Sequence, residues 1–288
     1  MIVFVTTQAH VYTHKAVTKE LPAVARRMSY ETLLGKARLP RAVYIFTDMD
    51  RLAPAALAQA SKLFGQLRAA GARVLNDPAR IRSRWGLLRM FHDQGINRAN
   101  AYRFDENVRP QRWPVFLGQE GDHRFPITDL LHSWEEVERA AEAAMQDGRP
   151  RSALIVAEYN AEPLRPGVFR KLSVFRIGSR YLAHTCVHQD RWVAKYGTPG
   201  LATPDLHAEE LRIVRDNPYR ASLEAAFSVA GIEYGRADFG VVNGAVHVYE
   251  INTNPEVKFT NPKSPPERKE SYAVFRQNYL DALRALES

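Results

Sequence analysis

The chain has 288 residues, of which 45% are hydrophobic and 25% charged, as is typical of a globular protein with two or three subdomains. The net charge of +8 predicts attraction for anions, and the single Cys186 excludes an intramolecular disulfide. The basic residues are scattered, without a nucleic-acid-binding motif, so no nucleic acid partner is predicted. No N-terminal signal peptide or membrane span is recognisable, and we expect a cytoplasmic protein with no membrane partner.

The N-terminal part of the chain alternates between apolar strands and an amphipathic helix. Apolar runs at Ile2–Thr6, 42–47 and 72–75 predict strands, and residues 54–70 predict a helix that begins at a proline and ends before a glycine. A strand–helix–strand order is typical of a small parallel sheet. We therefore expect the chain to open with an α/β subdomain.

A polar and basic segment lies between the first two of these strands. It carries two histidines and four basic residues: His10, His14, Lys15, Lys19, Arg26 and Arg27. The histidines could share a helix face, but without a third ligand nearby they do not predict a zinc site. We interpret the segment as solvated surface.

The middle of the chain contains two predicted helices and two predicted strands. Residues 77–94 and 133–147 predict helices, because each begins with a capping side chain and ends near a glycine. Apolar runs predict strands at 113–117 and 154–159. The first of these strands runs into a glycine-containing loop, 118–123.

The following part predicts a hairpin at 169–187, which alternates so that Lys171 faces one side of the strand and Arg176 the other. Residues 201–216 predict a polar excursion of the chain. Two further helices are predicted, at 219–230 and 272–286.

The segment 237–255, ADFGVVNGAVHVYEINTNP, predicts a second hairpin, with its turn at Asn243 and Gly244. It carries three side chains with metal-binding oxygens: Asp238, Glu250 and Asn252. Glu250 and Asn252 share a face of their strand, about 7 Å apart, because strand side chains alternate. Three hard oxygen ligands on one face would suit Mg²⁺ that is also held by nucleotide phosphates.

The turn decides whether Asp238 joins the other two residues. A two-residue loop pairs Asp238 with Tyr249 and puts it on the wrong face, whereas a three-residue loop pairs it with Glu250. The metal chemistry therefore predicts the three-residue loop, with Gly244 in the left-handed region.

This set of Asp238, Glu250 and Asn252, followed by an Asn-Pro pair, resembles the ATP-grasp superfamily, and within it RimK-type ligases and the synapsin C domain. The resemblance extends over about residues 72–260. It implies an α/β (α+β) fold in which an N-terminal α/β subdomain precedes two α+β subdomains that sandwich ATP. It also implies that ATP and Mg²⁺ are the cofactors and that these three residues are the metal ligands.

The resemblance further implies a set of nucleotide-binding residues. Glu158 and Tyr159 match the strand end at which the family contacts adenine and ribose. Arg84 stands where the family has a nucleotide-contacting lysine. In the hairpin at 169–187, either Lys171 or Arg176 would face the phosphates, and we favour Lys171.

Residues 190–197 resemble the Asn-Trp-Lys segment of synapsin, where a base approaches the reacting phosphate. Lys195 is the best match to this base, and Arg191 is the second choice. Together with Lys171 they are the predicted catalytic residues. The family's central phosphate-binding lysine is replaced by Gly118, and its loop carries the acidic Glu120 and Asp122. Their charge would weaken phosphate binding unless bases or a metal compensate for it.

By this resemblance the chain divides into an N-terminal subdomain (1–97), a middle subdomain (98–160) and a C-terminal subdomain with the metal site (161–288). The implied reaction joins a carboxylate to an amine or similar nucleophile through an acyl-phosphate, and the substrate would be an acidic small molecule or peptide. The basic residues of the segment 10–27 are candidates for contacting it. Two alternatives are a nucleotide-binding protein without ligase activity and an ATP-grasp kinase for small molecules.

Overall fold

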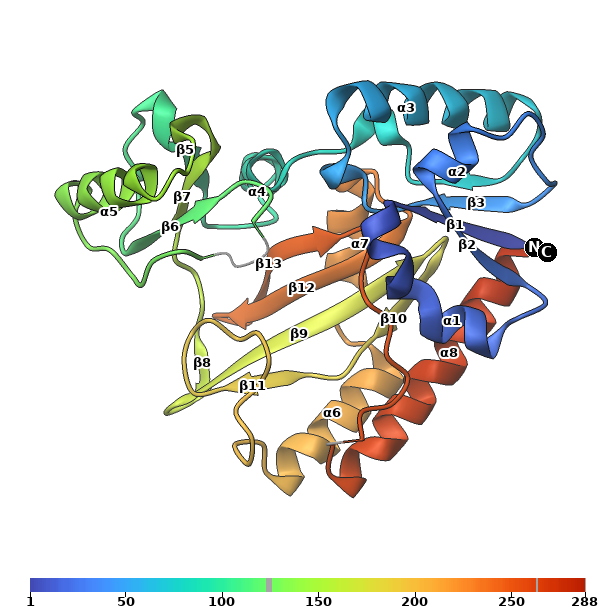
Figure 1. Ribbon diagram of the computed structural model, residues 1–288. Coiled ribbons are helices and arrows are strands. Elements are labelled where there is room, and N and C mark those ends of the chain that lie inside the picture. The colour runs from blue at the N-terminus through green and yellow to red at the C-terminus, as the bar shows by residue number, and fades with distance from the viewer. Residues whose placement is uncertain (123–125, 263, 288) are drawn as a thin grey trace.

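The computed structural model describes residues 1–122, 126–262 and 264–287, and Figure 1 shows their arrangement. These residues form one parallel sheet and two antiparallel sheets, each covered by helices. The mixed architecture confirms the α/β (α+β) class expected from the sequence. His123, the last residue of the predicted loop 118–123, lies outside the described residues.

The first sheet is parallel, with the strand order β2, β1, β3, β4. Its strands are β1 (Ile2–Thr6), β2 (Ala25–Ser29), β3 (Val43–Phe46) and β4 (Val74–Leu75). Both β1 and β3 are buried along their whole length, which explains their almost continuous apolar sequences. The strand β2 and the fully buried His14 show that the segment 10–27 is not simply solvated surface, because His14 stacks on the ring of Phe4.

Helices and short 3₁₀ turns connect these strands. They are η1 (Gln8–His14), α1 (Lys15–Glu20), α2 (Tyr30–Leu34), η2 (Met49–Arg51) and α3 (Pro54–Ala69). The helix α3 begins at Pro54, as predicted, and packs Phe64 and Leu67 into the core that lies over one face of the sheet. In Figure 1, α2 and α3 lie together on one side of the sheet.

The helix predicted over 77–94 is wrong in its first turn. Asp77 caps only the short 3₁₀ turn η3 (Pro78–Arg80), and the chain is then extended at Ile81. A second cap, the hydroxyl of Ser83, accepts a hydrogen bond from Gly86 N and starts α4 (Arg84–Asp93). The sequence thus contains two helix-capping residues, Asp77 and Ser83, and the longer helix begins after Ser83.

The second sheet is small and antiparallel, with the strand order β5, β7, β6. Its strands are β5 (Ala101–Arg103), β6 (Val115–Gln119) and β7 (Leu154–Glu158), with the 3₁₀ turns η4 (Phe104–Glu106) and η5 (Arg151–Ala153). The helix α5 (Trp134–Gln146) covers one face and is capped by Ser133, as predicted. The helix α4 packs Leu88 against residues of the opposite face.

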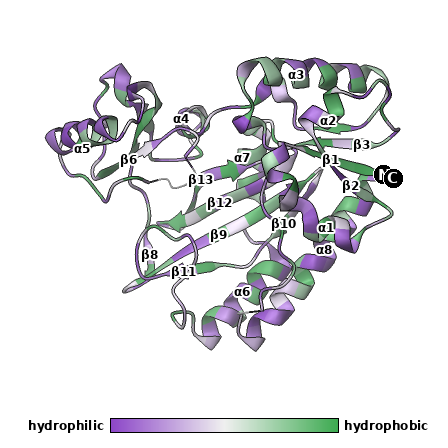
Figure 2. Cartoon of the chain, in the orientation of Figure 1, coloured by the Kyte–Doolittle hydropathy of each residue, from purple (hydrophilic) through white to green (hydrophobic). Residues whose placement is uncertain are grey.

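The third sheet is antiparallel and centred on β9. Its strands are β8 (Pro163–Arg165), β9 (Val168–Ile177), β10 (Arg180–Ala183), β11 (Val187–Gln189), β12 (Tyr234–Val242) and β13 (Ala245–Asn252). The helices α7 (Arg220–Ala230) and α8 (Lys269–Glu287) pack against it, and η6 (Pro266–Arg268) precedes α8. Figure 2 shows both hydrophobic and hydrophilic residues along β9 and β12.

Within the expected polar excursion, residues 204–216 form a helix, α6 (Pro204–Asp216), which was not predicted. Glu210 lies on the buried face of α6 and is 1% exposed. Its carboxylate accepts hydrogen bonds from Arg268 Nη2 at 2.7 Å and from Cys186 N at 2.7 Å. A charged residue on the buried face interrupts the apolar periodicity from which a helix is predicted. Its partners come from other parts of the chain, so the local sequence does not reveal that it is buried.

The first and third sheets share a hydrophobic core to which α8 contributes Phe275, Tyr279 and Leu283. Asn76, whose backbone is left-handed with φ 63°, also connects them. Its Nδ2 donates to Phe46 O at 3.0 Å and to Tyr234 O at 2.7 Å, and its Oδ1 accepts from Tyr234 N at 2.9 Å. The two chain ends lie together in Figure 1. Among the described residues, no helix is both long and apolar enough to cross a bilayer.

Candidate active site

Three neighbouring strands of the third sheet bring charged side chains to one face. Asp238 on β12 lies opposite Glu250 on β13, and Arg236 lies opposite Asn252. Lys171 on β9 lies two residues before Ser173, the β9 partner of Asp238. Because directly opposed residues share a face and strand side chains alternate, the three expected metal-binding residues and the two basic residues lie on the same face.

The turn of this hairpin differs from the prediction. Val242 pairs with Ala245, so the loop has two residues, and both Asn243 and Gly244 have positive φ angles, 49° and 76°. The register shifts between Asp238 and Phe239, where Tyr249 is the extra residue on β13. This β-bulge, rather than a three-residue loop, pairs Asp238 with Glu250.

Asp238 is buried between two bases. Arg236 donates from Nε to Oδ1 at 2.7 Å and from Nη2 to Oδ2 at 3.0 Å, and Lys171 Nζ lies 3.0 Å from Oδ2. The hydroxyl of Ser173 donates to Oδ1 at 3.0 Å. Burial by itself would raise the pKa of Asp238, but the positive charges of Arg236 and Lys171 outweigh burial and hold this pKa well below its usual range.

The other two expected metal ligands have different partners. Arg84, at the first position of α4, contacts Glu250 Oε2 through Nη2 at 2.5 Å. The Oδ1 of Asn252 accepts a hydrogen bond from Asn254 N at 2.8 Å. Helix α4 therefore brings its basic first residue to the strand that carries the carboxylate, although the predicted helix began earlier.

The remaining predicted bases lie in three different settings. Lys195 lines the large cavity described below, with its ammonium 5.4 Å from the centre of the Tyr196 ring. Arg191 is exposed and does not line that cavity. Arg176 points to the opposite face of β9, where Nη1 donates to Ile232 O at 2.9 Å and Nε to Gly178 O at 2.9 Å. Strand alternation therefore puts Arg176 on the face opposite Lys171, which favours Lys171 of the two alternatives left open by the sequence.

Glu158 lies at the end of β7, next to the cavity, but its carboxylate is engaged by the protein. Oε2 accepts from Asn100 N at 3.0 Å, and Oε1 accepts from Tyr102 Oη at 2.9 Å and from the backbone N of Gln111 and Arg112, both at 3.0 Å. The carboxylate thus ties the segment before β6 to the end of β7. A direct contact of Glu158 with a ribose hydroxyl would have to displace one of these bonds.

The acidic residues of the loop after β6 should repel phosphates less strongly than the sequence indicates. Gly118 lies within β6, opposite Ile155. Glu120 Oε1 accepts a hydrogen bond from Trp85 N at 3.0 Å, at the amino end of α4, and Asp122 lies 3.0 Å from Arg149 Nη1. Both acidic residues therefore have positively polarised partners that offset their charge.

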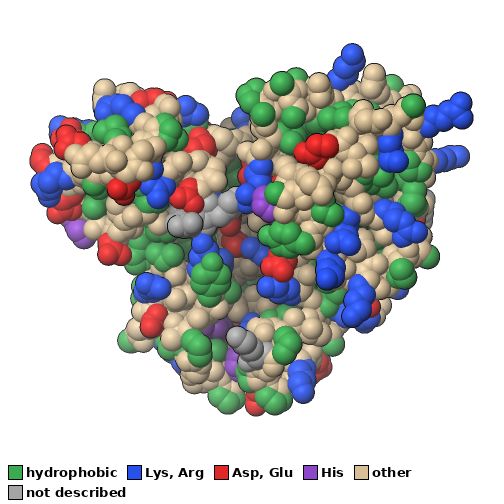
Figure 3. Space-filling model, in the orientation of Figure 1, with side chains coloured by type: hydrophobic (Ala, Val, Ile, Leu, Met, Phe, Trp, Pro, Cys, Tyr) green, Lys and Arg blue, Asp and Glu red, His purple; other side chains and the backbone are tan. Residues whose placement is uncertain are grey.

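A cavity of about 370 Å³ lies over the charged face, between the second and third sheets. Its polar lining includes Arg84, Lys171, Lys195, Arg236, Asp238 and Glu250. Its aromatic lining includes Phe116, Tyr159, Trp192 and Tyr249. Figure 3 shows this region as a hollow between the lobe that carries α5 and the rest of the molecule, with Lys, Arg, Asp and Glu side chains around it. The cavity has the volume of a typical small-molecule site.

The comparisons with solved structures extend over the whole chain. The VanG D-Ala:D-Ser ligase from Enterococcus faecalis matches with a TM-score of 0.56 and 13% identity, over 100% of this chain and 99% of that one. A RimK domain ATP-grasp protein from Sphaerobacter thermophilus matches with a TM-score of 0.51 and 15% identity, over 99% and 100%. The ATP complex of D-alanine–D-alanine ligase from Bacillus anthracis matches with a TM-score of 0.51 and 12% identity, over 99% of both chains.

The chain has the ATP-grasp fold. This confirms the fold that the resemblance in the sequence implied. No protein-family model and no curated protein sequence matches the chain. At identities of 12–15% the structural match establishes the fold alone.

Two features of the ATP-grasp cavity were missed in the sequence. Arg236 holds Asp238 from two residues away on the same strand, a spacing that puts both side chains on one face and could have been noticed. Trp192 lies with its ring centre 5.0 Å from that of Phe116 and 5.5 Å from that of Tyr159. These three rings come from distant parts of the chain, so sequence spacing carried no signal for the aromatic wall they form.

The donor chemistry of this face fits a magnesium ion. Asp238 and Glu250 offer carboxylate oxygens from directly opposed positions, and Asn252 offers an amide oxygen. Within the described ranges there is no cluster of three His, Cys, Asp or Glu side chains around a common point. Two carboxylates suffice for Mg²⁺ when substrate phosphates complete its coordination.

Proposed function

We propose that the chain is an ATP- and Mg²⁺-dependent ligase that joins a carboxylate to an amine through an acyl-phosphate. The observation that carries this proposal is the face of the third sheet on which Asp238, Glu250, Arg236 and Lys171 converge beneath the cavity. Phosphoryl transfer depends mainly on positioning and charge neutralisation, and this face concentrates both signs of charge.

The nucleotide would lie between the middle (98–160) and C-terminal (161–288) subdomains. The adenine ring would pack against the aromatic wall of Phe116, Tyr159 and Trp192, which presents an apolar surface for a flat base. The triphosphate would extend from there toward Lys171 and Arg236. Lys195, in the loop over the cavity, would contact the phosphates from the opposite side.

Asp238, Glu250 and Asn252 would hold the metal. Magnesium, when bound, neutralises phosphate oxygens and favours attack on the terminal phosphorus. Lys171 and Arg236 already lie at Asp238, so they stand beside the place where phosphate charge would arrive. Arg84 would supply part of the charge that the missing lysine at Gly118 does not.

These side chains support the two steps of the reaction without a protein nucleophile. In the first step, a carboxylate oxygen of the substrate attacks the terminal phosphorus and ADP leaves. In the second, an amine nitrogen attacks the acyl carbon and inorganic phosphate leaves. The bases Lys171, Arg236 and Arg84 would orient the phosphoryl group and stabilise its charge in both transition states.

A second function, nucleotide binding without ligation, is favoured by one observation. Gly118 provides no charge in the strand next to the cavity, and Glu120 of its loop is bonded to Trp85 N. A site without the central lysine could hold ATP and Mg²⁺ and still lack the charge needed for fast phosphoryl transfer.

Release of ADP separates these functions. We expect the chain with ATP and Mg²⁺ to release ADP only when a carboxylate and an amine are both supplied, for instance from D-alanine and the common L-amino acids. An ATP-dependent rise in melting temperature without turnover for any pair would favour the binding protein. A phosphorylated alcohol as product would instead identify a kinase.

A further inference from the structure

A second polar cluster lies at the carboxyl ends of β1 and β3. The chain leaves β1 for β2 on one side and returns to β3 on the other, so the gap between the ends of β1 and β3 is the topological switch point of this sheet. Open parallel sheets bind their ligands at such points, outside the carboxyl ends of the strands. The cluster is separate from the residues that line the large cavity.

Asp48, which follows β3, is the centre of the cluster. It is 1% exposed, and its backbone is left-handed with φ 59°, an uncommon conformation for a residue other than glycine. Its carboxylate accepts hydrogen bonds from Thr7 N at 3.3 Å and from the Thr7 hydroxyl, and it forms an ion pair with Arg51 Nε at 3.0 Å. The strained backbone is thus held by contacts across the switch point.

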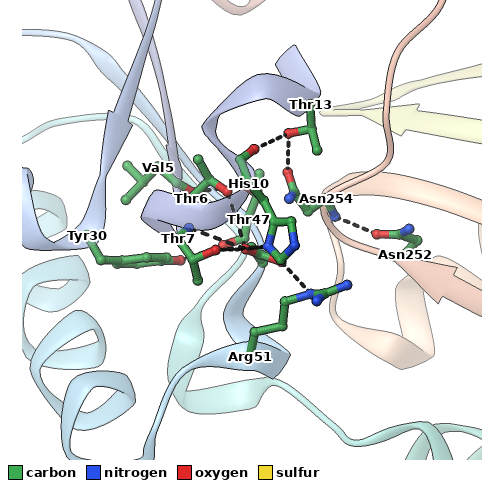
Figure 4. Close-up of polar contacts among 11 residues, drawn as sticks. Val5, Thr6, Thr7, His10, Thr13, Tyr30, Thr47, Arg51, Asn252 and Asn254 are labelled. Carbon is green, nitrogen blue, oxygen red and sulfur yellow. Dashed lines mark hydrogen bonds and ion pairs between the residues drawn. The ribbon is translucent and has the colours of Figure 1, made fainter. Parts of the chain in front are cut away.

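The same carboxylate orients His10. Nδ1 of His10 lies 2.8 Å from Asp48 Oδ2, and the histidine side chain is 21% exposed. The Thr7 hydroxyl also lies 3.0 Å from Nδ1. In the tautomer in which Nδ1 donates to the carboxylate, the lone pair of the ring lies on Nε2. Figure 4 shows one edge of the His10 ring at the contacts with Thr7, and the other edge on the side where Asn254 and Asn252 lie.

A short series of hydrogen bonds connects His10 to the strand of the proposed metal site. The Thr13 hydroxyl lies 2.9 Å from His10 O and 2.9 Å from Asn254 Oδ1. Asn254 N in turn donates to Asn252 Oδ1 at 2.8 Å. A second cavity, of about 70 Å³, lies at this end of β13 and is lined by Asp50, Arg84, Glu250, Asn252 and Thr253.

We propose that His10, held by Asp48, is the proton acceptor for the amine substrate, an inference that rests on the proposed ligase function. Nε2 takes a proton from the substrate ammonium, and the freed nitrogen lone pair forms the C–N bond at the acyl carbon. The C–O bond to phosphate breaks, and inorganic phosphate leaves with its electron pair and takes up the second proton that the nitrogen loses. The buried carboxylate of Asp48 stabilises the imidazolium that results, and a positioned general base contributes about 10²–10⁴-fold in rate.

The substitution His10→Asn tests this role. The amide nitrogen of asparagine reproduces the position of Nδ1 and keeps the bond to Asp48, but it cannot accept a proton where Nε2 stood. The assay supplies ATP, Mg²⁺ and D-alanine or the common L-amino acids as carboxylates, with either an amino acid or hydroxylamine as nucleophile. Hydroxylamine is largely unprotonated at neutral pH and needs no base.

We expect His10→Asn to keep the melting temperature, the ATP-dependent thermal shift and the hydroxylamine-dependent ADP release of the wild type. Ligation of the amino acid should fall about a hundred-fold or more. Wild-type ligation by the variant would show that His10 only holds its loop in place, and equal loss with both nucleophiles would show that it acts before the amine step. A wild type that turns over neither nucleophile would overturn the ligase proposal itself, and the role of His10 with it.

Discussion

At the scale of single residues, the two carboxylates of the proposed metal site differ in how firmly they are held. Asp238 is 2% exposed and is bonded to Arg236, Lys171 and Ser173. The side chain of Glu250 is 31% exposed and contacts Arg84. Glu250 is therefore the carboxylate that a metal arriving with ATP reaches with the smaller rearrangement.

The substitution Glu250→Gln should abolish the Mg²⁺-dependent part of the ATP-induced rise in melting temperature and leave the melting temperature without ATP unchanged. Removing the charge weakens metal binding, because an amide is a poorer ligand for Mg²⁺ than a carboxylate. Glu162→Gln is the matched control, since Glu162 lines the same cavity and is bonded to Asn243 N away from this face. Equal thermal shifts in wild type and Glu250→Gln would place the metal elsewhere.

Lys171 and Arg176 test the assignment of faces on β9. Lys171→Ala should weaken ATP binding about ten- to a hundred-fold, since a partly buried charge-assisted contact contributes about 1.5–3 kcal/mol. Arg176→Ala, on the opposite face, should leave the ATP affinity within about a factor of two. Calorimetric titration with ATP and Mg²⁺ measures both, and similar losses in the two variants would contradict the assignment.

At the scale of elements, the β-bulge in β13 brings Glu250 opposite Asp238, and Gly240 makes room for it. A Cβ atom at position 240 would lie 2.2 Å from the hydroxyl oxygen of Tyr249 and 3.0 Å from its Cζ. Tyr249 is the residue inserted by the bulge and directly precedes Glu250. The position of the proposed metal ligand thus depends on the absence of a side chain on the neighbouring strand.

Gly240→Ala should lower the free energy of unfolding by about 1–3 kcal/mol, because the new methyl group displaces the ring of Tyr249. It should also weaken Mg²⁺-ATP binding, since β13 moves next to Glu250. Adding Tyr249→Phe should restore part of both losses, as it removes the atom with the closest contact. Gly65→Ala, in a helix with nothing within 4 Å of the new Cβ, is the control and should not destabilise the protein. Urea denaturation and ATP titration measure these effects.

At the scale of the whole molecule, Asn76 holds the first and third sheets together through bonds to Phe46 O and to the start of β12. Asn76→Gly keeps the left-handed backbone and removes all of these bonds, so we expect a loss of about 3 kcal/mol in urea denaturation. Asn107→Gly, at an exposed left-handed residue, should cost much less. A small loss at Asn76 would mean that water replaces its side chain.

The stability of the protein should also depend on pH through two histidines, the buried His14 and the partly buried His184. Burial lowers the pKa of both His14 and His184 to about 3. Unfolding exposes them, so between pH 6.5 and about 3 the unfolded chain binds more protons and stability falls as the pH falls. Each histidine contributes about 1.4 kcal/mol per pH unit in this range, or about 2 kcal/mol between pH 6.5 and 5.

His184→Phe should therefore remove about half of the contribution of these two histidines, because phenylalanine cannot be protonated. The new ring should fit, since the ring of His184 lies among Phe175, Tyr272 and Phe275. Urea denaturation at pH 7 and pH 5 measures the change. The control His132→Gln, at an exposed histidine, should leave the pH dependence as in the wild type. The same dependence in His184→Phe as in the wild type would mean that His184 is protonated in the folded protein.

The sequence by itself determined the elements whose signals are local. The caps of α5, the proline at the start of α3 and the alternation along β9 and β12 arise from residues within a few positions of one another. The shared face of Glu250 and Asn252 follows from the same short-range geometry. These features need no knowledge of the rest of the fold, and the motif they form sufficed to indicate the ATP-grasp fold.

The tertiary structure alone decided which partners each polar side chain meets. The register of β13 depends on the space that Gly240 leaves for Tyr249. The burial of Glu210 depends on its bond with Arg268, and the burial of Glu158 depends on the donors at residues 100–112. Each of these depends on segments that are distant in the chain and come together only on folding. A buried charge is stable only when such partners are present, and local sequence does not contain them.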